Sequence, residues 1–160
     1  MIGREKNGSA MRVLEEEKAM KLAGYNFPAD LYYEQNHYWA RLEGELVTVG
    51  ITDYGQQVSG EIIHYLAPAI GSVVVQGKPF TSLEASKWVG QVYAPVSGKI
   101  VQVNEALQED ASPINTDPYG EGWLVKIEPA DLGELENLFR VETDSFRIWI
   151  ENELSVTEGE

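Results

Sequence analysis

The fold is decided by the stretch Glu84-Ala85-Ser86-Lys87-Trp88-Val89, which is followed by Val92-Tyr93-Ala94-Pro95-Val96-Ser97-Gly98-Lys99-Ile100. Residues typical of strands flank Lys87 on both sides, and Lys87 is the only basic residue between Lys78 and Lys99. We therefore expect Lys87 at the tip of a β-hairpin, where a rigid, protruding turn exposes its amine to a modifying enzyme. The pattern indicates a carrier of a covalent cofactor, although spacing alone also fits an ordinary surface lysine.

The composition excludes several classes of protein. A chain of 160 residues, 43% of them hydrophobic, can form one cored domain with appendages. Twelve basic and 26 acidic residues give a formal net charge of −14, so we expect no nucleic acid and no membrane partner. The absence of cysteine excludes disulfides, thiolate metal sites and cysteine nucleophiles. Without a secretory core or a membrane-spanning apolar run, a cytoplasmic protein is expected.

The chain divides into three predicted regions. Residues 1–26 form an N-terminal extension, either disordered or a short helix, because apolar residues recur at helical spacing before Gly24. Residues 27–130 form the main domain. Residues 131–160 are expected to form C-terminal helices and an acidic tail packed on that domain, since apolar residues again recur at helical spacing.

Short apolar segments separated by glycine and proline run from residue 32 to residue 127, which is typical of a β-sandwich or barrel. A hairpin is predicted from residues 37–42 and 46–51. After it, Asp53 is a candidate N-cap of a short helix that Gly60 would end. The other candidate strands are residues 61–66, 73–75, 79–83, 91–93, 99–103 and 123–127.

Five blocks of sequence, in order, resemble the lipoyl-carrying H protein of the glycine cleavage system over residues 27–149. The most specific is Asn115-Thr116-Asp117-Pro118-Tyr119-Gly120-Glu121-Gly122-Trp123-Leu124, because ordinary lipoyl domains of 2-oxoacid dehydrogenases lack it. The resemblance implies a mainly β fold, the lipoyl/biotinyl-type β-sandwich (barrel-sandwich hybrid), with a short internal helix and C-terminal helices. The other blocks are Pro28-Ala29-Asp30-Leu31-Tyr32-Tyr33 with His37-Tyr38-Trp39, Val49-Gly50-Ile51-Thr52-Asp53-Tyr54, Val92-Tyr93-Ala94-Pro95-Val96-Ser97-Gly98, and Val103-Asn104-Glu105-Ala106-Leu107.

Carried over residue by residue, the resemblance makes Lys87 the site at which lipoate is attached as an amide. Glu84 matches the acidic position next to that lysine. Biotin carriers share the architecture but normally bracket their lysine with methionines, whereas Ser86 and Trp88 flank Lys87 here. The implied protein is a swinging-arm carrier and not an enzyme, because the cofactor does the chemistry while the protein orients it.

The resemblance also implies partners. A lipoate ligase or lipoyl transferase would load Lys87, and the arm would shuttle an aminomethyl group among glycine decarboxylase, aminomethyltransferase and dihydrolipoamide dehydrogenase. A carrier that visits several enzymes is expected to be a monomer with small, transient contacts. His37 lies in the opening motif of the family and is assigned a weak contact with the stowed arm.

One departure from the family pattern opens an alternative. Small residues usually follow the modified lysine, with an acidic residue four positions beyond it, whereas this chain has Trp88-Val89-Gly90-Gln91. This run resembles H-protein-like lipoate-binding proteins of heterodisulfide-reductase-like sulfur oxidation. The arm would then pass a sulfur species to a reductase-like complex. A third hypothesis is an unmodified docking or scaffold subunit, in which Lys87 carries nothing.

Two other features are interpreted as structural. His37 and His64 lie 27 positions apart with no carboxylate cluster at ligand spacing, so no metal site is expected. Asp117-Pro118-Tyr119-Gly120 has the proline and glycine of turn chemistry and is expected to shape the fold.

Overall fold

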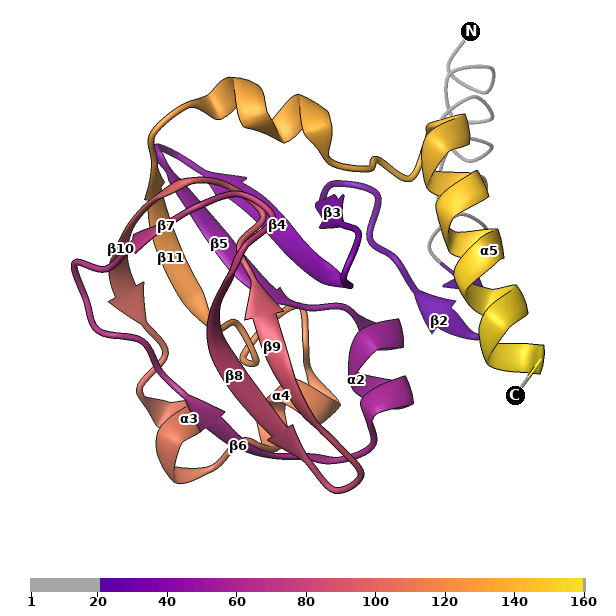
Figure 1. Cartoon of the computed structure of the whole chain (residues 1–160), viewed down its shortest axis with the longest axis horizontal. Helices are drawn as coiled ribbons and strands as arrows, with labels where there is room; N and C mark the ends of the chain where they lie inside the picture. Colours follow the sequence, from indigo (N-terminus) through magenta and orange to yellow (C-terminus); the bar gives the residue numbers. More distant parts are fainter. Residues whose placement is uncertain (1–20, 160) are drawn as a thin grey trace, which may run out of the picture.

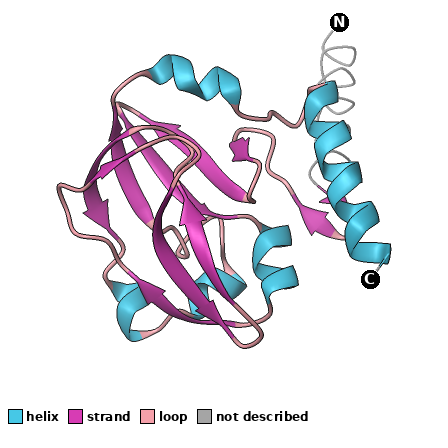
Figure 2. Cartoon of the chain, viewed as in Figure 1, coloured by secondary structure: helices cyan, strands magenta, loops and turns pink. Residues whose placement is uncertain are grey.

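The structure is a computed structural model that describes residues 21–159. It is a mainly β sandwich, as the sequence predicted, and one long helix forms its C-terminal end (Figures 1 and 2). All strand pairs of the described residues are antiparallel. The strands are β1 (Lys21–Leu22), β2 (Tyr25–Asn26), β3 (Tyr32–Glu34), β4 (Tyr38–Glu43), β5 (Leu46–Ile51), β6 (Ile62–Leu66), β7 (Val73–Val74), β8 (Pro79–Ala85), β9 (Val89–Tyr93), β10 (Gly98–Val103) and β11 (Val125–Pro129).

Two sheets enclose the main core. The larger has the strand order β3-β4-β5-β11-β10-β7, and the smaller has the order β6-β8-β9. Inward-facing residues of both sheets, such as Val49 and Ile127 on one and Leu83 and Val92 on the other, are fully buried in one apolar cluster. Burial of this cluster is the main force that holds the sandwich together.

Strand β4 is buried on both faces. Tyr38 and Ala40 contribute to the core between the sheets, whereas Trp39 points to the opposite face, as the two-residue period of a strand requires. There the Trp39 ring lies against Gly50, its cross-strand partner, and a Cβ at Gly50 would come within 2.5 Å of it. The Trp39 Nε1–H donates to the Pro118 carbonyl oxygen at 3.1 Å.

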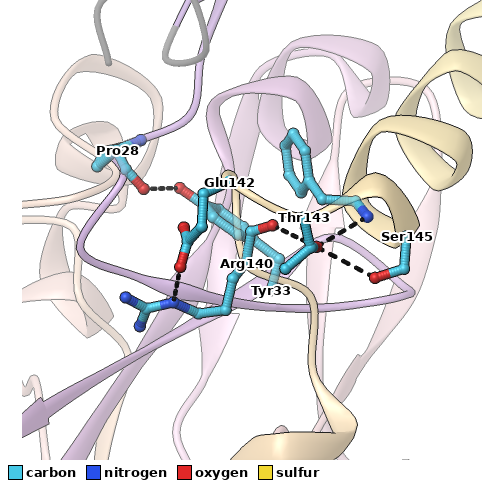
Figure 3. A network of polar contacts seen from close by, with 7 residues as sticks. Pro28, Tyr33, Arg140, Glu142, Thr143 and Ser145 are labelled. Atoms are coloured by element: carbon cyan, nitrogen blue, oxygen red, sulfur yellow. Dashed lines mark hydrogen bonds and ion pairs between the residues drawn. The ribbon is translucent and has the colours of Figure 1, made fainter. Parts of the chain in front are cut away.

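The long C-terminal helix α5 (Asp144–Gly159) lies beside β2 in Figure 1 and contributes to the buried cluster around Trp39. Phe146 and Ile150 of the helix are buried against Phe27 and Trp39, which confirms the predicted apolar face. At its start the Thr143 hydroxyl accepts a hydrogen bond from the Phe146 backbone N–H at 3.2 Å (Figure 3). Thr143 therefore occupies the N-cap position, where a side-chain oxygen satisfies an otherwise unpaired helix donor.

Further polar contacts, drawn in Figure 3, hold the segment that leads into this helix in place. The Thr143 hydroxyl donates to the Arg140 carbonyl oxygen at 2.7 Å, and the Arg140 guanidinium lies 3.4 Å from the Glu142 carboxylate. The Tyr33 hydroxyl donates to the Pro28 carbonyl oxygen at 2.6 Å, which anchors the chain before β3. The C-terminal helix thus has a defined entry beside β3.

Within residues 21–159, three shorter α-helices lie in the loops: α2 (Asp53–Ser59), α3 (Ala106–Glu109) and α4 (Ser112–Thr116). Helix α2 and its end at Gly60 were predicted, but the prediction that Asp53 is the N-cap was wrong. The cap is Thr52, whose hydroxyl oxygen accepts from the Gly55 backbone N–H at 3.0 Å. The Asp53 carboxylate instead accepts hydrogen bonds from the Asn26 backbone N–H and from the Gln56 side chain.

Other expectations need correction. The first predicted C-terminal helix is a 3-10 helix, η1 (Leu132–Asn137), and α3 and α4 were not predicted. The predicted N-terminal helix does not extend through Leu22, because Lys21–Leu22 pairs with Tyr25–Asn26 as a strand. The rest of that prediction lies outside the described residues, and the division at residues 26 and 130 stays a prediction. Along residues 21–159, no helix is long and apolar enough to cross a bilayer.

Candidate functional site

Lys87 lies at the tip of the hairpin formed by β8 and β9, as predicted. The Ala85 backbone N–H donates to the Trp88 carbonyl oxygen at 2.8 Å, so Ser86 and Lys87 are the two central residues of the turn. Neither Ser86 nor Lys87 has a positive φ, although the turns that usually connect two-residue hairpins contain at least one residue with a positive φ. The Ser86 backbone N–H donates to the Glu61 carbonyl oxygen at 2.8 Å, which fixes the tip to the chain that enters β6.

The side chain of Lys87 is exposed and accessible. No carboxylate of the described residues lies within the 4.0 Å of its amine that defines an ion pair. Its stem runs beside Gly60, where a Cβ would lie 3.5 Å from both Cγ and Cδ of Lys87 and 2.9 Å from the Ser86 hydroxyl. Gly60 also has a φ of 84°, a conformation that favours glycine. The site therefore presents a free primary amine on an anchored turn.

The neighbours of Lys87 point in different directions. Glu84 is exposed on β8, where it pairs with Val89 across the hairpin and with His64 of β6. Trp88 turns back along β9 instead, and its six-membered ring occupies the space that a Cβ of Gly90 would need. Because a residue with a side chain at position 90 would overlap the indole, Gly90 allows Trp88 to lie down on the strand.

A pocket of about 470 Å³ lies next to Trp88, between α2, the start of β4 and β9. Its lining includes no aspartate or glutamate, and Lys87 and Ser86 lie outside it. The Tyr38 hydroxyl is already occupied, since it donates to the Gln91 carbonyl oxygen at 2.9 Å. The lining therefore mixes aromatic and aliphatic residues with polar ones such as Asn36 and Ser59. Residues that line it include His37, Tyr38, Val58, Trp88, Gln91 and Tyr93.

His37 is held at the pocket by the C-terminal helix. Its imidazole stacks on Trp149 with ring centroids 5.0 Å apart, contacts Tyr54 on another side, and is 14% exposed. Burial lowers the pKa of His37 to about 4, so the ring is neutral at pH 7. The 3.3 Å contact between Nε2 and the Glu153 carboxylate is therefore not an ion pair at that pH. The other ring nitrogen, Nδ1, is buried without a hydrogen-bond partner.

The block from Asn115 to Leu124 holds the strands behind the tip. The Asn115 side chain accepts from the Ile62 backbone N–H at 2.8 Å and donates to the Ile62 carbonyl oxygen at 3.0 Å. Ile62 in turn pairs with Ala85, the last residue of β8. The Tyr119 hydroxyl accepts from the Asp53 backbone N–H at 2.9 Å at the start of α2. The interpretation of Asp117-Pro118-Tyr119-Gly120 as structural agrees with this contact of Tyr119.

Comparisons with known proteins agree with this geometry. The family model described as "Glycine cleavage H-protein" matches residues 31–147, which include the whole hairpin. The chain belongs to the glycine cleavage H-protein family. A glycine cleavage system H protein of Myxococcus xanthus is 43% identical over 113 residues, which are 71% of this chain and 88% of the relative. That of Thermus thermophilus is 42% identical over 117 residues, 73% of this chain and 91% of the relative.

A solved structure supports the same assignment. The crystal structure of an H protein from Mycobacterium marinum superposes with a TM-score of 0.65 at 35% sequence identity. The match covers 71% of this chain and 92% of that one. Proteins of the H-protein family carry lipoate on a lysine and act as carriers, not as catalysts.

The residues predicted for the site fall into two groups. Lys87, Glu84 and Ser86 are exposed at or beside the tip, outside the lining of the pocket. Trp88 and His37 lie together in the lining, although they are far apart in sequence. No group of three or more potential metal ligands is present in the part of this H-protein chain that the structure describes.

The sequence did not identify several residues of this region. Tyr38, Val58 and Tyr93 of the lining come from three separate elements, so no local pattern marks them. Gly60 and Gly90 allow close approach to the tip residues. An isolated glycine inside the strand that contains Gly90 was the available signal, because such a glycine often marks a close contact.

Proposed function

We propose that this chain is a lipoyl carrier and that Lys87 is its attachment site. The observation that carries the proposal is the position of Lys87: an exposed amine, free of a carboxylate partner among the described residues, on a turn that Glu61 anchors. A ligase must reach this amine without unfolding the protein, and a two-residue tip allows that. Membership of the H-protein family supports the same residue, because its model spans the hairpin.

Attachment forms an amide between the Lys87 amine and the carboxyl group of lipoate, made by a lipoate ligase or a lipoyl transferase. When bound, lipoate supplies a dithiolane that accepts a group or electrons at one partner and is reoxidised at another. The protein fixes the point from which the arm leaves, through the contact between Ser86 and Glu61. Loss of the amine charge makes the chain still more acidic than its formal −14, so basic surfaces are expected on its partners.

The first candidate load is an aminomethyl group. Family membership supports it, since H proteins of the glycine cleavage system serve glycine decarboxylase, aminomethyltransferase and dihydrolipoamide dehydrogenase. In this function the chain is a carrier in a multi-enzyme system, and the chemistry belongs to the cofactor and the partner enzymes. Glu84, exposed beside the tip, is the residue through which we expect the ligase and the partners to recognise the hairpin.

A second candidate load is a sulfur species passed to a heterodisulfide-reductase-like complex. The observation that favours it is the lack of aspartate and glutamate in the lining of the pocket next to Trp88. A protonated amine placed there would lose water without gaining a carboxylate partner from the lining, which is unfavourable. Both candidates use the same lysine and the same arm, and they differ in what the arm carries.

The test is loading by a purified lipoate ligase, followed by intact mass. The wild-type chain and a Lys78→Arg variant should each gain one lipoyl group, whereas Lys87→Arg should gain none. Lys78 is the matched control because it is also an exposed lysine in a turn. Loading of Lys87→Arg, or failure of the wild-type chain to load, would contradict the proposal and favour an unmodified docking subunit.

A further inference from the structure

We propose that the open edge of strand β7 binds the same edge of a second copy of this chain, so that the protein forms a weak, two-fold symmetric dimer centred on Val73. The inference goes beyond the proposed carrier function and does not depend on the attachment of lipoate. It gives a partner to a sheet edge that carries no charge.

The first argument is exposed apolar surface. Residues 65–77 contain no charged side chain, although 24% of the chain is charged. Of the 11 exposed large hydrophobic side chains among the described residues, four lie in this stretch: Leu66, Ile70, Val73 and Val75. Val73 is the most exposed of all of them, at 78%. Apolar side chains gathered on the surface in this way mark an interaction site.

The second argument is the backbone of β7. This strand is the last of the larger sheet and pairs with β10 on one side only. The Ser72 carbonyl oxygen accepts from the Ile100 backbone N–H at 2.9 Å, and Val73 faces Lys99 at the next position. Because bonded and non-bonded pairs alternate along an antiparallel ladder, the N–H and C=O of Val73 point away from β10. The open edge therefore presents a donor and an acceptor to another strand.

The edge is self-complementary. When Val73 lies opposite Val73 of a second, antiparallel copy, each N–H meets the C=O of the other, as a two-fold contact requires. The side chains of Val73 and Val75 then lie on one face of the joined sheet, since Val74 points into the core. Val73-Val74-Val75 contains neither a charge nor a proline, the residues that usually protect an edge from such pairing.

The third argument is charge, which favours a second copy over another protein. A chain with a net charge of −14 attracts basic partners, but residues 65–77 offer such a partner no carboxylate. Two acidic copies repel each other least where the facing surfaces carry no acid. Lys99, which pairs with Val73, also places a positive charge beside the contact. The uncharged edge is therefore suited to a second copy.

The dimer should be weak and should leave the arm free. Strand β7 has only two residues, so we expect a contact smaller than the about 800 Å² per partner of a stable interface. Figure 1 shows β7 away from the tip of the β8–β9 hairpin, so the contact leaves Lys87 of both copies exposed. At low concentration the chain is then the monomer that the sequence predicted.

Sedimentation equilibrium of the full chain measures this association. Between about 10 µM and about 1 mM, the apparent mass should rise from that of a monomer toward that of a dimer. Val73→Lys places two like charges opposite each other and should weaken the association about tenfold. Ile148→Lys is the matched control, because Ile148 is 60% exposed on α5, on the other side of the molecule from β7. Its association should equal that of the wild-type chain.

A cross-link tests the pairing at Val73 independently. The chain has no cysteine, so each variant carries a single thiol. Two bonded residues of an antiparallel pair have Cα atoms about 5.5 Å apart, which is within the range of a disulfide. With oxidised glutathione as the oxidant, Val73→Cys should form a disulfide-linked dimer about tenfold faster than Ile148→Cys at the same protein concentration.

Three results would overturn the inference. A wild-type chain that stays monomeric up to about 1 mM would leave the edge to another protein. Equal association of the wild-type chain and Val73→Lys, or equal disulfide rates in the two cysteine variants, would place the contact elsewhere. If circular dichroism shows that Val73→Lys is unfolded, the cysteine variants decide. None of these outcomes affects loading at Lys87, which intact mass measures separately.

Discussion

The indole of Trp88 lies across Gly90, in the space that a Cβ at position 90 would occupy. Gly90→Ala should therefore displace the ring and cost about 1 kcal/mol in the free energy of unfolding, as overpacking does at a site that can partly relax. Denaturant unfolding measures this cost, and quenching of tryptophan fluorescence by iodide should increase.

The control is the same change in a Trp88→Ala background. Without the indole, Gly90→Ala should be neutral or slightly stabilising, because alanine costs less conformational entropy than glycine in a strand. Equal destabilisation in both backgrounds would show that the ring does not depend on Gly90.

The imidazole of His37 should titrate far below its usual range. Burial lowers its pKa to about 4, whereas an unfolded histidine has a pKa of about 6.5. As the pH falls, the unfolded chain therefore binds the proton before the folded chain does. The free energy of unfolding that the neutral ring contributes is lost as the pH falls from about 6.5 to about 4. This linkage amounts to at most about 3 kcal/mol for one histidine. Titration of the imidazole nitrogen resonances by NMR measures the pKa directly.

His37→Asn is the matched variant for this prediction. His37 has a φ of 77°, and asparagine tolerates the left-handed region better than other side chains. The variant should lose the stability change between pH 6.5 and pH 4 while keeping the fold. A titration midpoint near 6.5 in the wild-type chain would contradict the buried, neutral imidazole.

Asn115 is expected to stabilise the strand behind the tip. Its side chain bonds both the N–H and the carbonyl oxygen of Ile62, as a neighbouring strand would. Asn115→Ala should cost about 1–3 kcal/mol, because both backbone groups lose a partner. Hydrogen exchange at the Ile62 amide should accelerate as well. Asn137→Ala, which removes an exposed bond to Gln76, is the control and should cost less than about 0.5 kcal/mol.

Tyr119 joins the Asn115–Leu124 block to the N-terminal side of the domain. Its hydroxyl accepts from the Asp53 backbone N–H at 2.9 Å and donates to the Asn26 carbonyl oxygen at 2.5 Å. Tyr119→Phe keeps the ring and should cost about 1 kcal/mol through the lost hydrogen bonds. Thermal unfolding measures the loss, and an unchanged midpoint would show that water replaces the hydroxyl at no cost.

The sequence predicted the elements that local patterns encode. Strand-like residues on both sides of an isolated lysine placed Lys87 at the hairpin tip, and Gly60 marked the end of α2. The helical spacing of Phe146 and Ile150 predicted the apolar face of α5. Each of these features depends on residues within a few positions of one another, so the pattern is visible without the fold.

The features that were missed depend on contacts between distant segments. The pocket brings Val58 of α2 and Trp88 of the hairpin together, and no spacing rule links them. Capping by Thr52 instead of Asp53 depends on tertiary contacts, because Asn26 and Tyr119 both bond Asp53. The neutral state of His37 likewise depends on Trp149 and the C-terminal helix.

The central claim is that this protein carries lipoate on Lys87. The most direct measurement is intact and peptide mass analysis of the protein isolated from its native host. We expect a mass increase of one lipoyl amide, located on the peptide that contains Lys87. A fully unmodified Lys87, or a lipoyl group on any other lysine, would contradict it.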